Sequence, residues 1–156
     1  LKKMYESYGN HSADFILMNH QAQYLWNKLS EPLRWANRYQ LDAYSVFCRT
    51  LGYGIRRSNC SPTHISESMF NEELPAQVLY LLVRMEKYRW NAERTVAVWR
   101  RAEVKDKVFL QHPLIMPFSE LLQRHPEEVE KDADVIYNLP YILALGGYEL
   151  YRLADQ

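Results

Sequence analysis

Basic side chains interleaved with aromatic ones are the residues best suited to a binding chemistry. From Lys28 to Arg57 there are six Lys or Arg and two Asp or Glu, an excess of four positive charges. Farther along, Arg, Lys and Asn recur at steps of three, four or seven from Arg84 to Lys105, which on a continuous helix places them on one face about 30 Å long. Such a face can follow a DNA phosphate backbone. The alternative is an exposed helix whose basic stems shield Trp and pair with nearby Glu.

The connector that begins at Arg56 and Arg57 is a second candidate for phosphate binding. Ser61 followed by Pro62 is typical of a helix start, with Ser as the N-cap and Pro in the first turn. The unpaired N–H groups of that start, flanked by the two arginines, can bind a phosphate oxygen. The alternative is a surface loop with two solvated arginines.

These patterns together define the predicted DNA-contacting residues. They are Arg34, Arg38, Arg56, Arg57, Ser61, Thr63, Arg84, Lys87, Arg94, Arg101 and Lys105.

Motifs for catalysis are absent from the sequence. There is no phosphate-cradling glycine loop, nucleophile elbow or HExxH pair. None of the five histidines has a neighbour at metal-ligand spacing. The acidic run from Glu127 to Asp134 is interpreted as a helix first turn and a solvated face. We therefore expect no enzyme, no catalytic residue, no metal and no cofactor.

The distribution of apolar residues predicts a mainly α protein, with residues 1–156 forming a single helical domain. Helices are expected over residues 22–29, 32–51, 63–70, 75–107, 119–124 and 126–138, and from Pro140 onward. The short apolar run 13–19 is the candidate for one N-terminal β-strand, with a buried helix turn as the alternative.

Charge and cysteine usage restrict the partners and the compartment. The net charge is zero, so binding to nucleic acid depends on where the charges lie. Cys48 and Cys60 cannot form a disulfide framework or a four-ligand zinc site, which is typical of a reduced cytoplasmic protein. No apolar run reaches the ~18 residues of a membrane span, so no membrane partner is expected. An opening Leu1 in place of Met is typical of a fragment or a trimmed chain.

Two segments carry a resemblance to a known family. The sequence 21–26, directly after the apolar run, and the sequence 81–87 on a predicted helix are similar to those of AcaB-type regulators of conjugative plasmids and integrative elements. The resemblance implies a ribbon-helix-helix-like transcription factor that binds DNA as a dimer. A base-reading ribbon exposes polar side chains, whereas run 13–19 is mostly apolar, so phosphate contacts are expected instead.

The expected function is a cytoplasmic, DNA-binding transcriptional regulator that dimerises through Phe15, Ile16 and Leu17. The pairing is expected because a lone strand with unpaired edges needs a mate, most simply its own copy. The alternative is a helical scaffold or adaptor that binds another protein through Tyr- and Trp-rich surfaces, with no nucleic acid involved.

Overall fold

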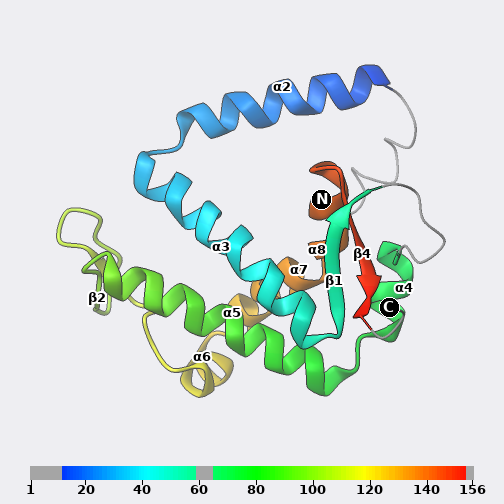
Figure 1. The fold of residues 1–156 in the computed structure, drawn as a ribbon. Helices are drawn as coiled ribbons and strands as arrows, with labels where there is room; N and C mark the ends of the chain where they lie inside the picture. The colour runs from blue at the N-terminus through cyan, green and yellow to red at the C-terminus, as the bar shows by residue number, and fades with distance from the viewer. Residues whose placement is uncertain (1–11, 59–64, 154–156) are drawn as a thin grey trace. The chain divides into compact units, whose positions relative to one another are not determined.

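The computed structural model describes the backbone of residues 12–58 and 65–153, and their side chains from residue 20 onward except 67 and 68. Within these residues the predicted mainly α class is confirmed, and two small sheets accompany the helices (Figure 1). In chain order the elements are α2 Ser12–Lys28, α3 Glu31–Thr50, β1 Tyr53–Arg57, α4 Glu67–Glu73, α5 Ala76–Val96, β2 Arg100–Arg101, β3 Gln111–His112, α6 Phe118–Arg124, α7 Pro126–Tyr137, α8 Leu139–Leu145 and β4 Tyr148–Arg152.

The chain divides into two units, residues 1–38 and residues 39–156. In the first unit, α2 begins at Ser12 and covers the run that was expected to be a strand. The strand prediction is therefore wrong, and the helical alternative is confirmed for the backbone. The physical reason is composition, since Ala, Leu, Met and Gln favour a helix and Ile16 is the only β-branched residue between Ser12 and Lys28. The strand pairing on which the predicted dimer was based is therefore not available in this helix, and dimerisation itself stays a prediction.

The second unit contains an antiparallel sheet that the sequence reading missed. Strands β1 and β4 pair in a register that places Ile55 opposite Leu150 and Gly54 opposite Tyr151. A side chain at position 54 would bring its Cβ to 2.3 Å from the Tyr151 ring, so any residue larger than glycine requires this ring to move. The sheet joins segments from opposite ends of the unit, and Figure 1 shows them side by side.

The segment before α4 also differs from the expectation. Ile65 forms a β-bridge with Leu150, and α4 begins only at Glu67. Its N-cap is Ser66, whose side chain accepts a hydrogen bond from the Met69 N–H at 3.3 Å. The predicted helix over residues 63–70 is therefore shifted, and the predicted cap at Ser61 lies outside the described residues.

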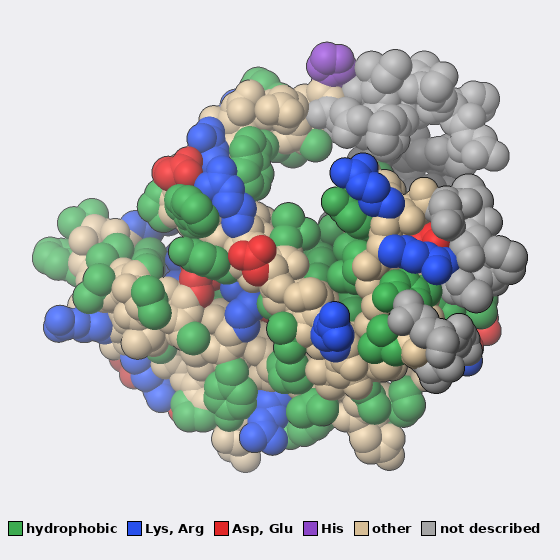
Figure 2. Space-filling view, in the orientation of Figure 1, with side chains coloured by type: hydrophobic (Ala, Val, Ile, Leu, Met, Phe, Trp, Pro, Cys, Tyr) green, Lys and Arg blue, Asp and Glu red, His purple; other side chains and the backbone are tan. Residues whose placement is uncertain are grey.

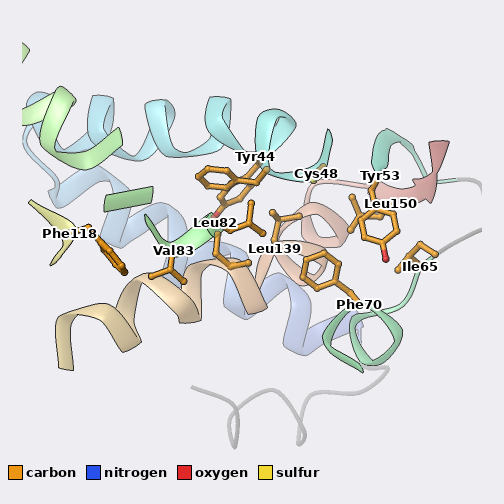
Figure 3. Packing of buried hydrophobic residues seen from close by; sticks show 12 residues of the cluster. Tyr44, Cys48, Tyr53, Ile65, Phe70, Leu82, Val83, Phe118, Leu139 and Leu150 are labelled. Carbon is orange, nitrogen blue, oxygen red and sulfur yellow. The ribbon is translucent and has the colours of Figure 1, made fainter. Parts of the chain in front are cut away.

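One hydrophobic core organises residues 39–156, and it draws on nearly every element of that unit (Figure 3). Helix α3 supplies Tyr44, Phe47 and Cys48, and α5 supplies Leu82 and Val83. The buried members from other elements are Tyr53, Ile65, Phe70, Phe118, Ile136, Leu139 and Leu150. Burial raises the pKa of the Cys48 thiol to about 12, which keeps it protonated at neutral pH.

Helix α5 ends eleven residues before the predicted Lys107, at Val96, and the reason lies in the backbone. Val98 has a positive φ of 64°. The Trp99 N–H donates to the Arg94 carbonyl at 2.9 Å and the Val98 N–H to the Thr95 carbonyl at 3.0 Å. These two bonds form a Schellman motif, in which the left-handed residue is usually glycine. A β-branched valine at this position is strained.

Val98→Gly should therefore stabilise the protein. Glycine adopts positive φ without steric cost, and Val98 is 63% exposed, so little apolar burial is lost. We expect a gain of about 1 kcal/mol in the free energy of unfolding, measured by urea denaturation. Ala97→Gly is the matched control and should lose about 0.5–1 kcal/mol, because Ala97 has an ordinary negative φ. Equal effects of the two changes would contradict the strain.

Candidate functional site

Helix α5 buries two adjacent residues of opposite charge, Glu86 and Lys87. The Glu86 carboxylate accepts two hydrogen bonds from the Arg89 guanidinium, at 2.7 and 2.8 Å. It also accepts a bond at 3.0 Å from the Gln40 amide on α3. Arg89 extends the network to Glu93, at 3.3 Å on the next turn. The buried carboxylate is thus fully surrounded by donors, as a buried charge requires.

Lys87 points to a different neighbour, the chain between β3 and α6. Its Nζ donates to the Leu114 carbonyl at 2.5 Å. One helical turn on, the Asn91 amide donates to the Met116 carbonyl at 2.8 Å. Two side chains of α5 therefore hold this segment along the helix through alternate carbonyls. Burial lowers the pKa of Lys87 to about 8, partly opposed by the nearby carboxylates of Asp132 and Glu128.

Lys87 is also one wall of a cavity of about 250 Å³ within residues 39–156. Its lining residues come from helices α5, α6 and α7 and from the chain that connects β2 to α6. The lining residues are Lys87, Trp90, Arg94, Lys105, His112, Leu114, Leu121, Glu128 and Asp132. The predicted acidic helix is confirmed as α7. Glu128 and Asp132 nevertheless face this cavity, so the expectation of a wholly solvated acidic face is wrong for them.

The titratable groups of the cavity have shifted pKa values. Burial raises the pKa of Asp132 to about 6, reinforced by Glu86 and opposed by Lys87 and Arg89. Burial also lowers the pKa of His112 to about 4, and the positive charges of Lys105, Arg94 and Lys87 act in the same direction. His112 is therefore neutral at pH 7. It meets the Trp90 ring edge-to-face, with the ring centroids 5.1 Å apart.

From the last residue of α5 to the residue before β3 the chain forms an ordered protruding segment, residues 96–110, which we call the tip. Strands β2 and β3 close its base, and the Arg100 N–H donates to the Leu110 carbonyl at 2.7 Å. Within it, the Asp106 carboxylate accepts from the N–H groups of Val108 and Phe109 at 2.8 and 3.0 Å. Asp106 also exchanges two backbone hydrogen bonds with Gln111. The tip therefore has a defined conformation.

The tip presents apolar side chains to solvent. Val108 is 84% exposed and Phe109 71%. Val96, Val98 and Val104 are also exposed. Basic residues surround them, because Arg100, Lys105 and Lys107 are exposed in the same segment. Figure 2 shows hydrophobic and basic side chains together at the end that carries β2. None of the patterns in the sequence predicted this surface.

The structure does not bring the predicted DNA-contacting residues onto one face of α5. Arg101 and Lys105 lie beyond the helix, so the continuous stripe is wrong. Lys87 is buried, and Arg101 is paired with the Glu120 carboxylate, with Nη1 to Oε2 at 2.8 Å. Arg84 is exposed and lies over the Tyr88 ring, at 5.6 Å from its centroid.

The other predicted DNA contacts are dispersed. In the first unit, Glu31 pairs with Arg34 at 3.3 Å and with Arg38 at 2.9 Å. Ser61 and Thr63 lie outside the described residues, as do the side chains of Phe15, Ile16 and Leu17.

Arg56 and Arg57 lie on β1, and they differ from each other. The Arg56 Nε donates to the Glu149 carboxylate at 2.7 Å, and Glu149 is only 2% exposed. Arg57 is exposed and lies over the Tyr148 ring, at 5.8 Å from its centroid. Arg56 is therefore the counter-ion of a buried carboxylate across the β1–β4 pair, whereas Arg57 remains open to solvent.

No known family model matches the sequence, and no curated protein matches it either. Among the described residues, no three or more His, Cys, Asp or Glu side chains gather where a metal ion could bind. The described helices include none with the length and apolar character needed to cross a membrane. Within the described part of residues 39–156, the tip and the cavity beside α5 are the two features that we take as candidates for function.

The Arg56–Glu149 pair predicts unequal effects for two neighbouring arginines. Arg56→Ala leaves a buried carboxylate without this counter-ion, and we expect it to lower the free energy of unfolding by on the order of 3 kcal/mol. Arg57→Ala is the control and should change it by less than about 0.5 kcal/mol. Adding Glu149→Gln to Arg56→Ala should recover part of the loss in urea denaturation. Equal losses for the two single variants would rule out this structural role.

The partly buried Asp132 predicts a pH-dependent stability. Its pKa is 3.8 in the unfolded reference and about 6 in the folded protein. Between these values the folded state binds more protons, so this group makes the protein less stable as the pH rises. His112 acts in the opposite direction at similar pH, which makes the wild-type profile alone uninformative.

The informative quantity is the free energy of unfolding of wild type minus that of Asp132→Asn. We expect this difference to fall between about pH 4 and pH 6 and to be constant above pH 7. Urea denaturation at each pH measures it. Asp134→Asn, at an exposed position of the same helix, controls for the amide substitution. A difference that does not vary with pH would show that Asp132 is not desolvated.

Proposed function

We propose that the chain is a protein-binding module that docks through its tip. The observation that carries this proposal is the exposure of Val108 and Phe109 on an ordered turn. Exposed large apolar side chains gathered in one place are typical of interaction surfaces. This proposal follows the alternative prediction from the sequence, a helical scaffold or adaptor that binds another protein. It differs in the binding surface, which is the tip and not a surface rich in Tyr and Trp.

The order of the tip supports docking on energetic grounds. Association loses conformational freedom wherever side chains and loops must become fixed. Asp106 already fixes the turn through two hydrogen bonds to backbone N–H groups, so less ordering remains for the bound state. An aromatic anchor that enters a partner pocket commonly dominates the binding energy of an interface. Phe109 is the residue of the tip that can serve as this anchor.

The charges around the tip indicate the chemistry of the partner. Arg100, Lys105 and Lys107 are exposed, whereas Glu103 is the only exposed acidic residue among residues 96–110. We infer a partner with an apolar pocket bordered by carboxylates, because such a surface complements both the apolar and the basic part of the tip.

DNA binding is the second candidate function, and the same basic residues favour it. Cations that surround an exposed aromatic side chain can contact phosphate while the aromatic side chain enters a groove. The dispersal of the other predicted arginines into ion pairs makes this candidate weaker than the first. The dimeric state, the cytoplasmic location and the resemblance to plasmid and conjugative-element regulators remain predictions.

A photo-crosslinking amino acid at position 109 distinguishes these functions in cells. We expect a discrete adduct with one other protein, because the side chain at 109 lies within the docked surface. The same crosslinker at Leu145, which is also exposed but belongs to α8, is the matched control and should give no such adduct.

The expected adduct should also weaken in Lys105→Glu with Lys107→Glu, since these changes reverse the charge around the tip. An adduct with nucleic acid would favour the DNA candidate, and one with a second copy of the chain would place the tip in a homodimer. Identical adducts from positions 109 and 145 would contradict specific docking.

A further inference from the structure

The cavity beside α5 contains more positive than negative side chains. Three cations line it, Lys87, Arg94 and Lys105, against two acidic residues. One of the two, Glu128, is paired with Lys131, whose Nζ lies 2.5 Å from its carboxylate. Lys131 thus offsets part of the negative charge of Glu128, and the lining keeps an excess of positive charge that attracts an anion.

Two Trp rings hold the Arg94 guanidinium in place, and its Nε is unsatisfied within the part of the chain that the structure describes. Its guanidinium carbon lies 5.3 Å from the Trp90 centroid and 5.2 Å from that of Trp99. Among the described residues, the buried Arg94 Nε has no hydrogen-bond acceptor, and the carboxylate oxygen of Glu93 lies 3.9 Å from it. A buried N–H without an acceptor is costly, and a ligand oxygen would satisfy it. Guanidinium groups suit oxyanions because their donors match the spacing of two oxygens.

The size and walls of the cavity restrict the ligand further. A volume of about 250 Å³ is smaller than a pocket for a drug-sized molecule, so the ligand has few atoms. Trp90, Leu114 and Leu121 supply apolar wall. Their presence favours an anion that carries an apolar or aromatic part over a bare inorganic ion.

We propose that this cavity binds a small organic anion, a carboxylate or a phosphate monoester, whose oxygens are held by Arg94 and Lys105. Lys87 contributes positive charge and two further N–H donors, since only one of its three is used on Leu114. The site shares Lys105 with the basic part of the tip, but Val108 and Phe109, the apolar part, do not line it.

Calorimetric titration of the full chain at low ionic strength tests the site. The probes are phenyl phosphate, benzoate, inorganic phosphate and the uncharged benzyl alcohol. We expect one-to-one binding of phenyl phosphate or benzoate, weaker binding of inorganic phosphate and none of benzyl alcohol. Comparing phenyl phosphate with benzoate shows which oxyanion the site prefers.

Three variants locate the binding. Arg94→Gln should weaken it about tenfold or more, because a charge-assisted hydrogen bond is lost. Lys105→Gln should weaken it less, and because Lys105 is exposed this variant keeps the fold intact. Arg100→Gln, an exposed arginine that does not line the cavity, is the matched control and should bind like the wild type.

Two results would overturn the proposal. One is that neither organic anion binds to the folded wild type at an anion concentration of ~10 mM, at which even a site with a Kd of about 1 mM would be mostly occupied. The other is equal weakening by Arg100→Gln and Lys105→Gln, which would indicate diffuse attraction to basic surface. Inorganic phosphate binding as tightly as phenyl phosphate would overturn the organic character of the ligand.

Discussion

The burial of Glu86 and Lys87 side by side on α5 is the constraint around which residues 39–156 are arranged. A buried charge must find partners, because transfer of an unpaired ion from water into a protein interior is very unfavourable. Adjacent residues on a helix point in directions about 100° apart, so the two charges cannot share the same partners. Glu86 is met by Arg89 and by Gln40 of α3, and Lys87 by a carbonyl of the chain before α6.

This division of partners also creates the cavity. Lys87 and Asn91 hold the segment 114–116 against α5 by its backbone, and that segment leads out of β3. Side chains from α7 approach the same helix from another direction and bring Asp132 close to Lys87. The polar lining of the cavity thus follows from satisfying one buried lysine. The tip is anchored to the same region through the β2–β3 pair.

The sequence was informative where a local rule decided the outcome. Helices α3, α6 and α7 begin and end close to the predicted residues, because prolines and glycines mark their ends. Gly52, with a φ of 78°, follows the end of α3, and Pro126 opens α7. The long-helix prediction failed because Thr95 to Trp99 contains no glycine or proline, and a valine occupies the left-handed position. The five-residue strands after Gly52 and Gly147 contain Tyr, Ile and Leu, of which Tyr and Ile favour β-structure. The sequence reading still missed them, because each strand pairs with a segment far away in the chain.

The sequence by itself determined the helical class and the absence of familiar catalytic motifs, since each depends on residue type and short-range spacing. Tertiary structure alone decided which charged residues are available for binding. Arg56 and Lys87 looked like phosphate contacts in sequence, yet each is committed to a partner at least 27 residues away. Conversely, no sequence pattern singled out Phe109, yet it is exposed on an ordered turn. Charge and hydrophobicity are properties of residues, but burial and pairing arise only when distant segments meet.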